Sequence, residues 1–131
     1  MKTLVDVTQP RLILFVTGVL SMLLALWHFA NRGELVANVA TRATHDLNGL
    51  SMLFAGLVTV AVAWMAVSPH LTASYAALYG VYNVAYAWIL FFAGISWPRA
   101  GVTAILAVAA LFAASNAWTG RHQDEKTPGT R

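Results

Sequence analysis

The sequence predicts an all-α membrane protein, a bundle of four antiparallel transmembrane helices. Hydrophobic residues make up 59% of the 131 residues and charged residues only 10%, whereas a soluble domain carries roughly 25% charged residues. No Asp, Glu, Lys or Arg falls within residues 12–30, 47–67, 71–95 or 100–120. Each of these runs is long enough for the roughly 17 to 25 residues that cross a hydrocarbon core. The runs do not alternate between apolar and polar residues as the strands of a membrane barrel do.

We therefore expect helices at residues 11–30, 47–67, 71–93 and 99–118 in a single domain, residues 1–119, followed by a disordered polar tail, residues 120–131. Pro10 and Pro98 suit the first turns of the first and fourth helices. Pro69 cannot continue the preceding helix, so the second and third helices are expected to be antiparallel neighbours. Residues 34–44 lack Pro and Gly and could form a short surface helix, after which Asp46 would cap the second helix.

The distribution of basic residues gives an expected orientation. Five of them lie on the side of the termini and three on the opposite side, which favours an inner (plasma) membrane with both termini in the cytoplasm. The two groups are Lys2, Arg11, Arg121, Lys126 and Arg131 against Arg32, Arg42 and Arg99. Because these residues are scattered at helix ends and form no patch, we expect no nucleic-acid partner.

The third predicted helix carries the pattern that most resembles a binding site. On a helix, Tyr75, Tyr79, Tyr82 and Tyr86 fall within about 60° of one another, and Asn83 lies at the edge of this stripe. The stripe could form the wall of a site for a lipophilic small molecule. The alternative is helix packing, with the hydroxyls bonded to neighbouring helices. The opposite face predicts close approach of another helix, because its residues are small: Ala73, Ala77, Gly80, Val84 and Ala87.

A second group, His28, His45, Asp46 and Asn48, is expected at one membrane level. His28 and His45 are candidate metal or haem ligands by residue type. However, they are separated by 17 residues and lie at the rim of the bundle. We therefore expect interfacial histidines, with no metal and no cofactor.

Several classes of function are disfavoured by what the spans lack. Ion pumps, voltage sensors and proton-coupled transporters place ionisable residues within the membrane, and the four apolar runs that predict the spans contain no Asp, Glu, Lys or Arg. The chain has no cysteine for disulfides or thiol catalysis and no G-x-S-x-G serine motif. No residue pattern identifies a known family.

The leading hypothesis is a small non-catalytic integral membrane protein that binds a lipophilic small molecule or acts as a subunit or scaffold of a membrane complex. Besides the lipid bilayer, the expected partners are further copies of the chain or other membrane subunits. The alternative is a membrane-embedded enzyme acting on a hydrophobic substrate, with Tyr79, Tyr82, Asn83 or the His28 and His45 pair as its polar groups. A passive pore ranks last, because only the third helix has a continuous polar stripe.

Overall fold

Four helices make up the computed structural model, which describes residues 9–31, 39–65, 68–92 and 97–126 and contains no strand within these ranges. They are α1 (Pro10–Ala30), α3 (Val39–Trp64), α4 (Pro69–Phe92) and α5 (Trp97–Lys126). Each contains a stretch that is long and apolar enough to cross a membrane. The predicted class, an all-α four-helix integral membrane protein, is confirmed.

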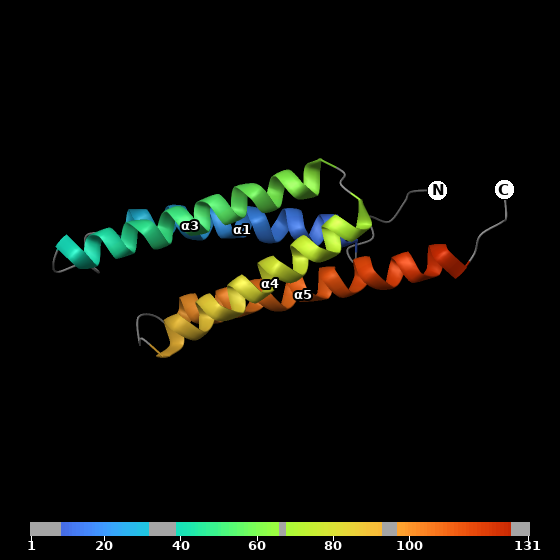
Figure 1. Cartoon of the computed structure of the whole chain (residues 1–131). Helices are drawn as coiled ribbons and strands as arrows, with labels where there is room; N and C mark the ends of the chain where they lie inside the picture. Colours follow the sequence, from blue (N-terminus) through green and yellow to red (C-terminus); the bar gives the residue numbers. More distant parts are fainter. Residues whose placement is uncertain (1–8, 32–38, 66–67, 93–96, 127–131) are drawn as a thin grey trace, which may run out of the picture.

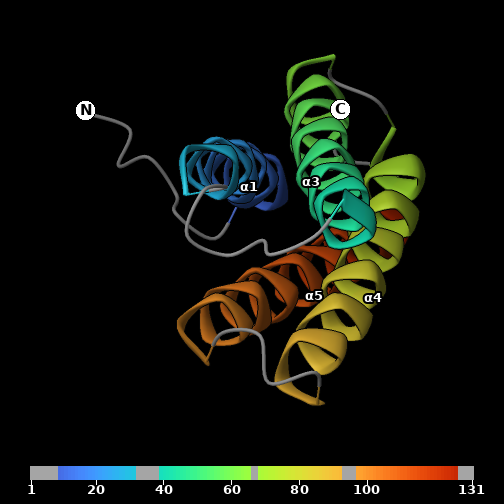
Figure 2. The ribbon, with the colours of Figure 1, turned by 90° about the vertical axis from the view of Figure 1, so that its left-hand side faces the viewer.

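The helices are arranged as two hairpins (Figures 1 and 2). α1 packs most extensively against α3, and α4 against α5, with a further contact between α1 and α5. Hydroxyl pairs join α3 to α4 at Thr59 with Tyr75 and at Ser51 with Tyr82, and the Tyr75 hydroxyl also lies 3.5 Å from the carbonyl oxygen of Ala55. The residue numbers of the bonded partners rise along α4 as they fall along α3, so the two helices run in opposite directions. They are antiparallel neighbours, as predicted. They meet through long tyrosine side chains, whereas the closest packing of α4 is with α5.

The helix boundaries differ from the predicted ones most at the start of α3 and at the end of α5. α3 begins at Val39 and not at residue 47, because no Pro or Gly separates the predicted surface helix from the span. Asp46 therefore lies inside α3, and its predicted capping role is wrong. α4 begins at Pro69, where Ser68 Oγ accepts a hydrogen bond of 3.3 Å from the backbone N–H of Leu71.

At the carboxyl end, α5 continues to Lys126, past the predicted end at residue 118. Residues 120–126 of the predicted tail are therefore helical, and residues 127–131 lie outside the described residues. The sequence Arg-His-Gln-Asp-Glu-Lys supplies several good helix formers after Gly120.

The α1–α3 hairpin is closely packed at a pair of glycines that the sequence pattern alone did not single out. A Cβ added to Gly18 would lie 2.9 Å from the carbonyl oxygen of Gly56, and one added to Gly56 would lie 2.7 Å from the carbonyl oxygen of Gly18. The two backbones therefore touch directly, which is how small residues promote helix association in membranes.

The small face of α4 packs against α5, which gives the predicted close helix approach a specific partner. A Cβ added to Gly80 would lie 2.7 Å from Leu111 Cδ2. The core around this contact consists mainly of alanine with two larger side chains: Leu14, Ala63, Ala76, Tyr79, Ala110, Ala113 and Ala114. Van der Waals contact between small residues thus holds both hairpins together.

Replacing Gly56 by Ala tests the backbone contact. We expect a loss of about 1–3 kcal/mol in the free energy of unfolding, because the new methyl group overlaps the backbone of α1. Gly101→Ala is the matched control, since a Cβ at Gly101 would meet no described atom within 4 Å. Reversible unfolding in mixed detergent micelles measures both variants. Equal stability of the two would contradict the close crossing.

Candidate functional site

The tyrosine stripe of α4 faces α3, and two of its hydroxyls are bonded there. Tyr75 Oη lies 2.7 Å from Thr59 Oγ1, and Tyr82 Oη lies 2.8 Å from Ser51 Oγ. The rings stack in pairs along the helix, with centroids 6.2 Å apart for Tyr75 and Tyr79 and also for Tyr82 and Tyr86. The hydroxyls of Tyr75 and Tyr82 therefore stabilise the junction of the two hairpins, and the rings form its wall.

Tyr79 and Asn83 lie deeper than the rest of the stripe, each only 3% exposed. Tyr79 Oη points to the carbonyl oxygen of Thr17 in α1, at the long distance of 3.5 Å. Asn83 Nδ2 donates a 2.8 Å hydrogen bond to the carbonyl oxygen of Tyr79. Asn83 thus donates one amide N–H to the backbone of its own helix, and Tyr79 extends the stripe towards α1.

A groove of about 370 Å³ runs along the junction of α3 and α4. This volume lies within the roughly 300–1,000 Å³ typical of small-molecule sites. Three stripe residues line it, and the remaining lining is apolar. The lining residues are Phe54, Ala55, Val58, Tyr75, Leu78, Tyr79 and Tyr82. We call this space the tyrosine groove; its wall suits aliphatic or aromatic ligand groups.

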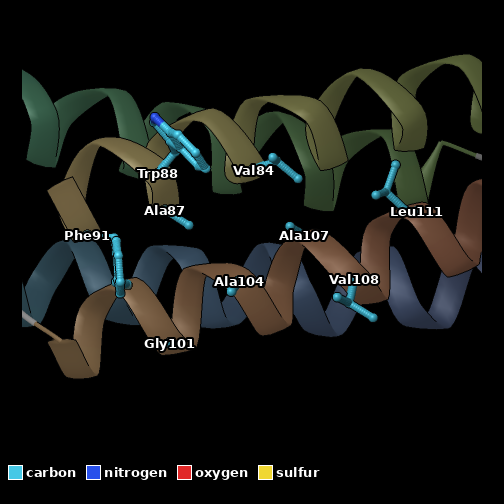
Figure 3. A pocket seen from close by; sticks show the side chains of 10 residues that line it. Val84, Ala87, Trp88, Phe91, Gly101, Ala104, Ala107, Val108 and Leu111 are labelled. Carbon is cyan, nitrogen blue, oxygen red and sulfur yellow. The ribbon is translucent and has the colours of Figure 1, made fainter.

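A second groove, of about 490 Å³, lies between α4 and α5 (Figure 3). It begins beyond the contact of Gly80 with Leu111, where Val84 and Ala87 of α4 face small residues of α5. Its lining consists of Val84, Ala87, Trp88, Phe91, Ala100, Gly101, Ala104, Ala107, Val108 and Leu111. We call it the alanine groove; it has no charged or hydroxyl-bearing lining residue.

A buried polar cluster joins three helices near one end of the bundle. Arg99, in the first turn of α5, donates a 2.8 Å hydrogen bond from a terminal guanidinium nitrogen to His28 Nδ1 in α1. His28 Nε2 lies 2.8 Å from the backbone carbonyl oxygen of His45 in α3. A guanidinium only donates and a carbonyl only accepts, so His28 must be neutral with its proton on Nε2.

Aromatic rings enclose this cluster. The rings of His28 and His45 stack with centroids 3.5 Å apart and an interplanar angle of 13°. The Arg99 guanidinium carbon lies 4.5 Å from the centre of the Trp27 ring, a cation–π geometry. His45 Nδ1 is 3.8 Å from Asp46 Oδ1. His28, His45 and Asp46 of the predicted group thus lie near one another, while their common membrane level with Asn48 stays a prediction.

The geometry of the two histidines does not suit a shared metal or haem. Both ring nitrogens of His28 are engaged, and stacked rings do not aim their nitrogens at a common point. Within the described ranges, no group of three or more His, Cys, Asp or Glu side chains is placed to hold a metal ion. What the cluster can do chemically is recognise a polar or anionic group through the Arg99 guanidinium.

Arg99 corrects the prediction that the spans lack ionisable residues. It lies within the span Pro98–Thr119 and is only 7% exposed, and the span of α3 begins at Arg42 and so includes Asp46. The bundle therefore contains a buried charged group. Arg99 is four residues before Thr103 and eight before Ala107, both buried, so it lies on the buried face of α5, which only the packing of the helices identifies.

A second arginine makes a structural link at the opposite end. Arg11 Nε donates a 3.2 Å hydrogen bond to the carbonyl oxygen of Ala63 in the last turn of α3. A cation is favourable there because the last carbonyls of a helix carry partial negative charge. Arg11 thus has a partner that accounts for its position.

Comparison with known proteins gives no assignment: the chain matches no protein-family model, and no curated protein or solved structure matches it.

Substitution of His28 tests the polar cluster. His28→Leu leaves the buried Arg99 N–H without its partner, and we expect a loss of about 1–3 kcal/mol, the usual cost of an orphaned buried donor. His28→Gln can still donate and accept, so it should lose less than half as much. Unfolding in mixed micelles measures both. A leucine variant as stable as the wild type would contradict the described contacts.

Proposed function

We propose that this integral membrane protein is a non-catalytic binding protein that holds a lipophilic small molecule in the tyrosine groove. One observation carries the proposal: a groove of about 370 Å³ lined by three aromatic rings of a single stripe. Aromatic rings offer large rigid contact surfaces to apolar ligands. The five stripe residues are the proposed binding residues: Tyr75, Tyr79 and Tyr82 line the groove, Asn83 backs it, and Tyr86 continues it.

The hydroxyl contacts support binding in preference to catalysis. Tyr75 and Tyr82 are hydrogen-bonded to Thr59 and Ser51, so both hydroxyls have a role in joining the helices that requires no reaction. A membrane enzyme acting on a hydrophobic substrate is the alternative, and product formation in the binding experiment below would favour it.

The alanine groove supports a second candidate function, that of a subunit or scaffold. Glycine at position 101 is not required by packing within the chain, because an added Cβ would meet no described atom within 4 Å. Small residues on an exposed helix face allow a second transmembrane helix to approach closely. A further copy of the chain or another membrane subunit would fit this groove.

The proposed location is the inner (plasma) membrane with both termini in the cytoplasm. An even number of spans places both termini on the same side, and five basic residues against three favour that side as cytoplasmic.

Photolabelling in nanodiscs tests the binding proposal. The probe is hexadecanol carrying a diazirine group, and the labelled peptides are identified by mass spectrometry. We expect saturable labelling of α3 and α4 residues that border the tyrosine groove, and displacement of the label by excess hexadecanol. Saturation separates a site from the surrounding lipid, which labels in proportion to probe concentration.

Two matched variants locate the site. Val58→Trp fills the tyrosine groove, and Val84→Trp fills the alanine groove. We expect Val58→Trp to reduce saturable labelling by about tenfold or more, which corresponds to the loss of about 1.4 kcal/mol of binding, and Val84→Trp to leave it unchanged. The reverse pattern, or labelling that never saturates, would contradict the proposal.

A further inference from the structure

We propose that the ligand is an amphiphile with an acidic head group and that Arg99 binds this head group side-on. The inference rests on the proposed function, because the apolar part of the ligand would occupy the tyrosine groove. It assigns a role to a buried charge that the apolar groove alone does not explain.

The unused donors of Arg99 have the geometry of an oxyanion receptor. Of its three guanidinium nitrogens, one is bonded to His28, while Nε and the other terminal nitrogen have no hydrogen-bond partner among the described residues. These two nitrogens form one edge of the planar group, and their parallel N–H bonds match the two oxygens of a carboxylate or a phosphate. His28 fixes the orientation of the group, and both unpaired nitrogens are buried.

The charge of Arg99 also calls for an anion. The side chain is 93% buried, being 7% exposed, and a buried cation is costly unless it is paired. Its described contacts are a neutral imidazole and the face of the Trp27 ring. Neither neutralises a full positive charge. No carboxylate within the described part of the chain is hydrogen-bonded to the free edge.

A small cavity lies beside Arg99, lined also by Trp27 and Tyr86. Its volume of about 10 Å³ has room for one atom the size of a water oxygen. A complete carboxylate or phosphate needs more space, which Trp27 can provide by turning outward, since its side chain is 48% exposed. Trp27 would then be the outer wall of the head-group site.

Tyr86 separates this cavity from the tyrosine groove, and in the proposal the ligand passes along its ring. It borders the cavity and stacks on Tyr82, which lines the groove. Tyr75, at the far end of the groove, precedes Tyr86 by 11 residues, or about 16 Å at the helical rise of 1.5 Å per residue. A single long acyl chain spans this distance while its head group lies at Arg99.

Competition in nanodiscs of phosphatidylcholine tests the head-group assignment. The bound diazirine-hexadecanol is displaced by hexadecanoate, by hexadecyl phosphate or by hexadecanol, at mildly alkaline pH where both acids are ionised. For each acid we measure how much more strongly it competes than the alcohol. For at least one acid we expect this acid-to-alcohol ratio to be about tenfold higher in the wild type than in Arg99→Gln. Comparing two proteins in the same membrane cancels differences in partitioning. The stronger acid identifies carboxylate or phosphate.

The outcomes separate the two proposals. If the probe shows no saturable labelling, the proposed function fails. If it labels saturably but acid and alcohol have the same ratio in wild type and Arg99→Gln, the acidic ligand is refuted and lipophile binding stands. If Arg99→Gln does not fold, Arg99→Lys replaces it. Lysine keeps the charge but lacks the two parallel N–H bonds, so the preference for the acid should still fall severalfold. An unchanged preference would overturn side-on binding.

Glu34 provides the necessary internal control, because it belongs to the connection between α1 and α3 that lies outside the described residues. If the wild type shows no preference for the acid and Glu34→Gln gains one, the chain's own carboxylate occupies Arg99 and the proposal is overturned. A preference that is the same in wild type and Glu34→Gln supports an external acid.

Discussion

The hydrogen bond from Arg99 to His28, continued by the bond from His28 to the carbonyl of His45, is the interaction on which this end of the bundle depends. The first bond joins α5 to α1 and the second joins α1 to α3, so together they link the two hairpins. The contacts of Gly18 with Gly56 and of Gly80 with Leu111 lie within the hairpins and do not make this link. In hydrocarbon, polar groups without partners are strongly unfavourable. The neutral imidazole satisfies a donor on one helix and an acceptor on another at the same time.

Other polar side chains in the spans follow the same constraint. The hydroxyls of Thr59 and Ser51 pair with tyrosines of α4, and Asn83 and Thr17 bond to backbone carbonyls of their own helices. Arg99 and His45 depart from it, because two nitrogens of each side chain are buried without a hydrogen-bond partner among the described residues; of the two, only Arg99 carries a fixed charge. A buried cation with an unused edge is the feature for which packing gives no reason, and a ligand gives one.

The fold could be predicted from the sequence because charge segregation and span length are strong signals, and the tyrosine stripe was visible as a helical period. The polar cluster could be predicted only in part. The sequence predicts His28 and His45 at one level, but it predicts Arg99 only as one of the basic residues at helix ends on the side opposite the termini. Which way that first turn faces depends on how α5 packs against α1. The Gly18–Gly56 crossing likewise depends on the pairing of helices, which hydropathy does not encode.

The most direct test of the central claim is nitrogen NMR of the His28 side chain in nanodiscs, assigned by comparison with His28→Gln. The described contacts predict a neutral ring with the proton on Nε2 and an unprotonated Nδ1 that accepts a hydrogen bond from Arg99. In Arg99→Gln the Nδ1 signal should shift, because its donor has changed. A proton on Nδ1, or a signal that does not respond to the change at Arg99, would contradict the account.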